Sequence, residues 1–249
     1  MYKIVSWNIN SVRARISLVL EFLEKIKPDV LLLQETKCLE DQFPRAEILS
    51  QGYQSIVSGQ KAYNGVAILH KSPVTDVKFR FDGFDLTDAR YLEAQIDGLR
   101  ISNLYVFNGQ DLDSDSYRNK VPFVSALCDY AASHIESEQP WILFGDFNII
   151  PRTIDIWNRS LEWEKTGLAC PEIRGYWRKL QTQGWLDAGQ DAGMTWKGYR
   201  YQQRPELRID HALLSPGAAD RLHRVEVLRE WRTDREKPSD HMPVLLEMH

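Results

Sequence analysis

Polar side chains that could bind a cation or move a proton stand at the ends of apolar segments of this chain. They are Asn8, Asn10, Glu35, Asp146, Asn148, Asp240 and His241. The ends of buried strands are where α/β proteins commonly build their sites. Taken one at a time, each of these residues also fits an ordinary role in a turn, a cap or a solvated strand end. The combination favours a site.

The oxygen-bearing members of this set predict a metal site. Carboxylates from Glu35 and Asp240, with amide oxygens from Asn8 or Asn10, make a hard ligand set. Such sets suit Mg²⁺, with Mn²⁺ as a substitute, better than zinc. The three cysteines are far apart in the sequence, so neither a structural zinc site nor a disulfide framework is expected.

Asp210 lies within an apolar segment, where a carboxylate is costly unless it has a partner. His241 is the natural partner. An acid beside an imidazole fixes the tautomer of the ring and favours its charged form. An imidazolium beside a scissile phosphate stabilises developing negative charge. His211 is not expected to belong to the site. Neighbouring side chains on a strand point to opposite faces, so His211 should point away from the face that carries Asp210.

Short apolar runs separated by turn residues predict many strands and few helices. The expected helices span residues 16–26, 115–135 and 173–183. The expected strands span residues 3–7, 30–34, 54–57, 65–69, 91–96, 100–106, 141–144, 207–214, 225–229 and 244–247. This pattern predicts an α/β fold with two packed sheets flanked by helices, ahead of a doubly wound parallel sheet. Without a linker or repeat, residues 1–249 are expected to form a single domain.

The composition is that of a globular protein, with 43% hydrophobic and 27% charged residues, which excludes disorder as the main state. No run approaches the roughly 20 apolar residues that span a bilayer. The first residues lack the basic start and apolar core of a signal peptide, so a cytoplasmic protein without membrane partners is expected. The formal charge of −4 does not itself indicate a nucleic-acid binder. A local basic face is still compatible with it.

Several motifs, in order along nearly the whole chain, resemble the bacterial exonuclease III and AP endonuclease family. This family is a branch of the endonuclease/exonuclease/phosphatase superfamily. The motifs are WNINSVR at 7–13, QETK at 34–37, SGQK at 58–61, GVA at 65–67, GDFNI at 145–149, LRIDH at 207–211 and KPSDH at 237–241. Each is weak alone, but their shared order and spacing are specific. The resemblance implies a DNase I-like four-layer sandwich, in which two mixed sheets pack face to face and helices flank them.

The resemblance also implies roles for individual residues. Glu35 matches the principal metal ligand of the family, and Asn8, Asn10 and Asp240 match positions at or next to the metal. Asp146 matches the residue that activates the attacking water or protonates the leaving group. Asn148 and Tyr105 match contacts to the phosphate, and Asp210 and His241 match the catalytic dyad.

The same resemblance implies a DNA-binding surface. Trp196, Leu207 and Ile209 match positions that line a small apolar pocket, which holds a sugar without its base. Tyr199 and Arg200 belong to a stretch that interleaves aromatic and basic residues, a pattern suited to stacking and phosphate contact. The other expected DNA-binding residues are Arg13, Arg90, Asn108 and Lys237. The implied partner is double-stranded DNA with an abasic site or a recessed 3′ end, bound by a monomer.

The implied reaction is Mg²⁺-dependent hydrolysis of a phosphodiester bond that leaves a 3′-OH end. It would serve DNA repair as an abasic-site endonuclease or a 3′–5′ exonuclease that processes 3′ ends. Residues 157–170 depart from the family pattern and are rich in tryptophan, and bulk there would favour 3′-end trimming over abasic-site cleavage. Two alternatives stay open. One is a phosphatase of the same superfamily, and the other is a nuclease-like regulator that only binds nucleic acid.

Overall fold

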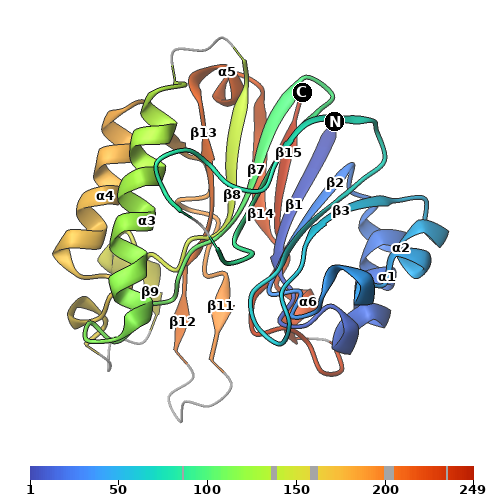
Figure 1. Ribbon diagram of the computed structural model, residues 1–249, viewed down its shortest axis with the longest axis horizontal. Coiled ribbons are helices and arrows are strands. Elements are labelled where there is room, and N and C mark those ends of the chain that lie inside the picture. The colour runs from blue at the N-terminus through green and yellow to red at the C-terminus, as the bar shows by residue number, and fades with distance from the viewer. Residues whose placement is uncertain (86, 136–138, 158–161, 199–204, 234) are drawn as a thin grey trace.

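The computed structural model describes residues 1–85, 87–135, 139–157, 162–198, 205–233 and 235–249. Two six-stranded sheets lie face to face at the centre, and helices cover the outer face of each (Figure 1). This arrangement confirms the four-layer α/β sandwich expected from the sequence. No helix in the described ranges is both long and apolar enough to cross a membrane.

The first sheet has the strand order β14-β15-β1-β2-β4-β3. Its strands are β1 (Tyr2–Asn8), β2 (Val30–Gln34), β3 (Gln54–Ser58), β4 (Val66–His70), β14 (Leu222–Val227) and β15 (Val244–Met248). Only β1 and β2 run parallel, and the other neighbours are antiparallel. The parallel pair brings the ends of β1 and β2 to the same edge of the sheet.

The second sheet has the order β10-β13-β8-β7-β6-β5. Its strands are β5 (Val74–Lys78), β6 (Tyr91–Ile96), β7 (Leu99–Tyr105), β8 (Trp141–Asp146), β10 (Leu186–Asp187) and β13 (Asp210–Leu214). Here β7 and β8 form the parallel pair. A separate small sheet joins β11 (Trp196–Lys197), β12 (Glu206–Leu207) and β9 (Ile156–Trp157).

Helices α1 (Ile16–Ile26), α2 (Arg45–Ser50) and α6 (Glu230–Thr233) lie beside the first sheet, and α3 (Asp115–Ala132) and α4 (Pro171–Thr182) cover the second (Figure 1). A short α5 (Pro216–Ala219) follows β13. Single 3-10 turns occur at Arg13–Arg15, Glu40–Gln42, Thr153–Asp155 and Trp163–Lys165.

The central strands are apolar on both faces because each face is covered. Along β2, Val30 and Leu32 belong to the core between the sheets, whereas Leu31 and Leu33 pack on the helix side with Phe22. A continuous run of aliphatic residues is therefore the pattern that such a strand requires. This packing buries the strands up to the points where their polar ends begin.

Several of the sequence-based elements need correction. The short elements α2, α5, α6, β9, β10 and β11 were not expected, and the strand expected over 225–229 is β14, which begins at Leu222 and ends at Val227. The expected strand 207–214 is two strands, β12 and β13, because Arg208 between them turns into a buried ion-pair cluster. The edge strand β5 was not expected, since it is short and mostly exposed. The helix expected over 115–135 ends at Ala132.

Candidate active site

The polar strand ends meet at one edge of the two sheets. Asn8 and Gln34 are paired in the parallel β1–β2 register, so Glu35 follows directly beside Asn8. Tyr105 and Asp146 are paired in the parallel β7–β8 register, and Asp210 opens β13 opposite Asp146. The fold thus brings together residues from both halves of the chain.

Several residues at this edge adopt the left-handed backbone conformation. Glu35 has φ 53°, Asn148 has φ 50° and Asn10 has φ 48°. Residues other than glycine rarely adopt it, and such strain tends to gather at functional sites. The chain turns sharply at these points, immediately after the buried strands.

The side-chain amide of Asn8 links the two acids. Its Nδ2 atom donates to Oε1 of Glu35 at 2.8 Å and to Oδ2 of Asp146 at 2.9 Å. Lys37 forms an ion pair with the other oxygen of Glu35 at 2.7 Å. Burial raises the pKa of Glu35, but the charge of Lys37 and these hydrogen bonds outweigh it and hold the pKa below its ordinary value. Glu35 is therefore ionised at neutral pH.

Asp210 and His241 form the expected acid–imidazole pair. Nδ1 of His241 lies 2.9 Å from Oδ2 of Asp210, and Nε2 lies 3.8 Å from Oδ2 of Asp146. Burial lowers the pKa of His241, but the charges of Asp210 and Asp146 outweigh it and raise the pKa to about 10. The imidazole ring is thus a buried cation between two acids.

Asp146 is the buried acid at the centre of the site. Burial raises its pKa to about 7, and the negative charges of Asp210 and Glu35 act in the same direction, against the cationic His241 and the Asn8 amide. A carboxylate with a pKa near neutrality is suited to accept or donate a proton during a reaction. Tyr105 stays protonated beside it, because burial and the charges of Glu35 and Asp146 raise its pKa well above 10.

Glu35, Asp146 and His241 form the one cluster in the described ranges that could hold a metal ion, with ligand atoms within 4.8 Å of one another. Two carboxylates this close repel each other, and a divalent cation between them would relieve that repulsion. Because the ring of His241 is protonated, the carboxylate oxygens are the suitable ligands, and oxygen ligands fit a hard cation such as Mg²⁺. The residues present therefore fit the metal expected from the sequence.

Asp240 and Asn10, both expected at the metal, lie beside this cluster and are held by other groups. Oδ1 of Asp240 accepts a hydrogen bond from Asn10 at 3.0 Å, and Oδ2 accepts one from the indole of Trp196 at 3.1 Å. The Asn10 amide oxygen accepts a hydrogen bond from Lys37 at 2.7 Å. Asp240 thus connects the acidic cluster to the pocket wall, and its role at the metal stays a prediction.

A pocket of about 170 Å³ opens next to the acids. It is lined by Glu35, Tyr105, Asn108, Gln110, Asp146, Asn148, Trp163, Leu168, Trp196, Leu207, Ile209, Asp240 and His241. One wall is polar, and there Asn108 donates to the side-chain oxygen of Asn148 at 3.0 Å. The opposite wall is apolar and includes Trp163, from the unusual tryptophan-rich segment, together with Trp196 and Leu207.

The expected DNA-binding residues outside the pocket differ in their exposure to solvent. Arg13 and Lys237 are exposed, whereas Tyr199 and Arg200 lie outside the described residues. Arg90 is only 9% exposed. Its guanidinium pairs with Asp88 at 3.2 Å and stacks over the ring of Phe107.

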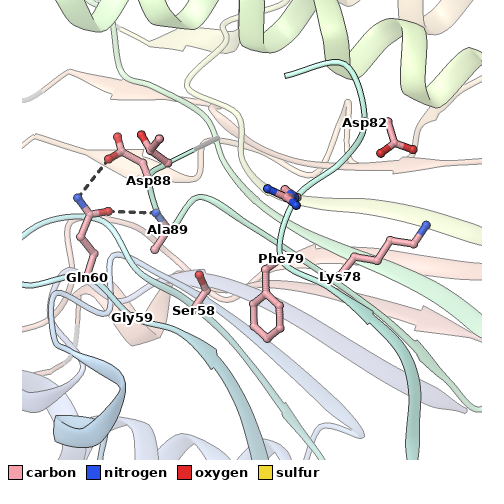
Figure 2. Close-up of a pocket in the computed structure, with 10 residues that line it drawn as sticks. Ser58, Gly59, Gln60, Lys78, Phe79, Asp82, Asp88 and Ala89 are labelled. Atoms are coloured by element: carbon pink, nitrogen blue, oxygen red, sulfur yellow. Dashed lines mark hydrogen bonds between the residues drawn. The ribbon is translucent and has the colours of Figure 1, made fainter. Parts of the chain in front are cut away.

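A loop contact supports Arg90 from the other side. Figure 2 shows Gln60 joined to both Asp88 and the backbone of Ala89. The loop after β3 is thereby tied to the segment before β6, beside an open pocket of about 660 Å³ lined by both. The guanidinium of Arg90 also stacks over the ring of Tyr105. This placement suits Arg90 to fix both the start of β6 and the Tyr105 ring.

Two buried groups near the site escaped the sequence analysis. Arg208 pairs with Asp155 at 2.9 Å and with Asp187 at 2.8 Å, and it supports the strand that begins at Asp210. Lys120 is fully buried in α3 beneath Asn148. Its position in the apolar stripe with Phe123 and Leu127 was the available signal, because a lysine there is unusual.

Comparisons with known proteins agree with this architecture. The sequence profile of the Endonuclease/Exonuclease/phosphatase family matches residues 5–241. Exodeoxyribonuclease III of Haemophilus influenzae is 32% identical over 98% of this chain and 99% of its own length.

Solved structures give the same picture over the full length. The 3′ phosphatase NExo from Neisseria, bound to a product DNA hairpin, has a TM-score of 0.93 and 35% identity, with 100% of both chains covered. An AP endonuclease from Archaeoglobus fulgidus has a TM-score of 0.92 and 29% identity, covering 100% of this chain and 99% of its own. The chain belongs to the endonuclease/exonuclease/phosphatase family, as a phosphodiesterase of its exodeoxyribonuclease III and AP endonuclease branch.

Proposed function

We propose that this chain is a Mg²⁺-dependent DNA repair nuclease that hydrolyses the phosphate on the 3′ side of a deoxyribose and leaves a 3′-OH end. The observation that carries this proposal is the meeting of Glu35, Asp146 and the Asp210–His241 pair beside a small pocket. The relatives act on DNA by name, and one of them was solved with a DNA hairpin.

The proposed mechanism is an in-line attack of water on the phosphorus. The bond from phosphorus to the 3′ oxygen breaks as the new bond forms, and the leaving oxygen takes a proton from solvent to become the 3′-OH. Asp146, with a pKa near 7, takes the proton of the attacking water. The imidazolium of His241 neutralises charge on the phosphate oxygens, and Asp210 keeps that ring charged and oriented. The amides of Asn108 and Asn148 and the hydroxyl of Tyr105 bind the phosphate from the polar wall. Mg²⁺, held by Glu35 with Asp146 next to it, would supply Lewis-acid stabilisation of the phosphate and the leaving oxygen.

The pocket supports a substrate that places a single sugar there. Its volume of about 170 Å³ is below the roughly 300 Å³ at which pockets for drug-sized ligands begin. An apolar wall of Trp163, Trp196 and Leu207 suits the bare face of a deoxyribose without its base. We therefore infer cleavage at abasic sites, with duplex DNA as the substrate.

The 3′-end processing activity is the second candidate. It is favoured by the 35% identity to a 3′ phosphatase and by Trp163, which narrows the pocket. A terminal 3′-phosphate needs less room than a sugar flipped out of a continuous strand. The two activities share one catalytic centre, so the pocket decides their ratio.

Labelled duplexes test the proposal directly. One carries an internal abasic site, one carries a recessed 3′ end, and one carries a 3′-phosphate, each assayed with Mg²⁺ and with EDTA. An EDTA-sensitive nick 5′ to the abasic site is the result expected of an abasic endonuclease. Loss of the terminal phosphate or nucleotide without internal nicking would make the chain a 3′-end processing enzyme.

The remaining alternatives have their own outcomes. Release of phosphate from small phosphomonoesters, with all three duplexes left intact, would support a superfamily phosphatase instead. Salt-dependent DNA binding without any metal-dependent product would support a regulator that only binds. Either result would overturn the proposed nuclease.

A further inference from the structure

A buried lysine lies beneath the polar wall of the pocket. The side chain of Lys120, in α3, has no solvent exposure. Its Nζ atom donates to the backbone carbonyl of Asn148 at 2.6 Å and to that of Asn108 at 2.9 Å. In the described ranges it forms no ion pair with a carboxylate within 4 Å. A buried charge without such a partner is costly, so its presence calls for an explanation.

The two carbonyls belong to the loops that carry the polar wall. Asn108 follows β7 and Asn148 follows β8, and these strands are the parallel pair of the second sheet. The side chains of the two residues are hydrogen-bonded to each other at 3.0 Å. Lys120 therefore joins the same two loops a second time, through their main chains.

The contact to Asn148 reaches the central acid. The backbone N–H of Asn148 donates to Oδ1 of Asp146 at 2.9 Å, while its carbonyl accepts from Lys120. Asn148 also holds a left-handed φ of 50°. Its main chain is thus fixed on both sides in a conformation that L-residues rarely adopt. Removing the lysine contact frees the peptide after Asn148, which adjoins the peptide that donates to the Asp146 carboxylate.

We propose that Lys120 is a positioning residue for phosphate hydrolysis, in which its ammonium group fixes the main chains of Asn108 and Asn148 and through them the Asp146 carboxylate. The substrate in this inference rests on the proposed function, whereas the contacts of Lys120 do not depend on it. Lys120 touches neither phosphate nor metal, since it is fully buried under the loops. It also places positive charge near the phosphate that the two amides would bind.

Burial and the charge of Asp146 act on Lys120 in opposite directions. Burial lowers the pKa of Lys120 to about 7, and the negative charge of Asp146 acts in the opposite direction. The cation is therefore supported by the same acid that it helps to orient. A lysine with only a packing role would need no such arrangement, because a methionine has nearly the same length and is suited to the apolar stripe of α3.

The test compares Lys120→Met with Lys120→Arg and with the control Lys25→Met. Lys25 is an exposed residue of α1, paired with Glu21 on its own helix. We expect Lys120→Met to lower kcat on the abasic or 3′-phosphate duplex at least 100-fold while KM changes less than threefold. Lys120→Arg keeps the cation and its donors and should recover at least a tenth of the wild-type kcat. Lys25→Met should leave both constants unchanged.

A second readout does not depend on DNA cleavage. The affinity for inorganic phosphate, followed by NMR shifts of the Asn108 and Asn148 side-chain amides, should fall at least tenfold in Lys120→Met. A wild type that binds phosphate but cleaves no DNA would refute the proposed nuclease and leave this comparison intact.

Folding is checked by circular dichroism and thermal melting. Wild-type kcat and phosphate affinity in a folded Lys120→Met variant would overturn the inference. A loss of activity that only follows the folded fraction would overturn it too. If the methionine variant does not fold, Lys120→Gln, which keeps a donor without the charge, is judged by the same two readouts.

Discussion

Nδ1 of His241 lies 2.9 Å from Oδ2 of Asp210, and the other ring nitrogen faces Asp146 at 3.8 Å. The imidazole is thus placed between two carboxylates that are both almost fully buried. Because both acids favour the charged ring, its pKa is raised from 6.5 to about 10. The ring is a permanent cation throughout the physiological pH range.

Replacing Asp210 should remove most of this effect. In Asp210→Asn the pKa of His241 moves back toward its ordinary value, since the largest opposing charge is gone. We expect kcat to fall roughly 10²- to 10⁴-fold, as for loss of a positioned proton-transfer or charge-stabilising group. The wild type should keep the charged ring up to about pH 10, whereas the variant should lose residual activity as the pH rises through neutrality. A pH–rate profile and an NMR titration of His241 check this, and an unshifted titration would contradict it.

Asp146→Asn separates chemistry from binding. The amide keeps the shape of the side chain but cannot accept the proton of the attacking water. We expect cleavage to be abolished, while the affinity for duplex DNA changes less than about fivefold. Gel-shift titration in EDTA and single-turnover cleavage in Mg²⁺ measure the two effects. Turnover at the wild-type rate would remove Asp146 from its assigned role.

Metal removal should abolish the reaction without unfolding the chain. Chelation by EDTA is expected to stop cleavage, and Mg²⁺ or Mn²⁺ should restore it, because the cluster offers carboxylate oxygens. Glu35→Gln should weaken the apparent Mg²⁺ affinity at least tenfold. Metal titrations of the cleavage rate give this value. An unchanged metal dependence in Glu35→Gln would place the ion elsewhere.

Loss of the buried ion-pair cluster around Arg208 should lower the free energy of unfolding strongly. Arg208→Met removes the ion-pair partner of the buried Asp187 and leaves Asp155 with Arg152 alone, which costs about 3–5 kcal/mol of unfolding free energy. The exposed pair of Arg118 with Asp115 is the control, and Arg118→Met should have a much smaller effect. Urea denaturation compares the variants. Equal losses would show that burial of the pair does not matter.

The same cluster predicts acid sensitivity. Burial alone would raise the pKa of Asp155, but hydrogen bonds from Arg152 and Arg208 hold it below its ordinary value of 3.8. A carboxyl with a lowered pKa in the folded state contributes stability above pH 3.8. That contribution is lost as the pH falls through the lowered value. Asp155→Asn should therefore flatten the acid limb of stability against pH, measured by urea midpoints between pH 2 and 6.

Much of the site could be predicted from the sequence because its residues sit at the ends of apolar strands. Asn8, Glu35 and Asp146 follow uninterrupted hydrophobic runs, and the structure places them in mutual contact. The acid within the apolar segment, Asp210, required a partner and has His241. The ends of such strands can be predicted because a strand buried on both faces is a continuous apolar run, which stops where the polar residues begin.

Other features depend on tertiary contacts that no local pattern records. From the sequence, Arg90 is expected to contact DNA as a free cation. In the fold its guanidinium pairs with Asp88 and stacks over the ring of Phe107. The carboxylate of Asp240 is expected at the metal, and in the fold each of its oxygens accepts one hydrogen bond, from Asn10 and from Trp196. The partners of Asp240 are distant in the sequence, 44 positions for Trp196 and 230 for Asn10. Roles for these residues at the metal or on DNA stay predictions.

The first and last strands along the chain, β1 and β15, lie side by side in the first sheet, with Tyr2 paired to Met248 (Figure 1). The same pairing brings Ser239, just before His241, against the backbone of Asn8 at 2.6 Å. During synthesis on the ribosome, Asn8 emerges early and His241 emerges more than two hundred residues later. The catalytic centre is therefore assembled only when almost all of the described chain has left the exit tunnel. A nascent or truncated product would be unable to cut nucleic acid.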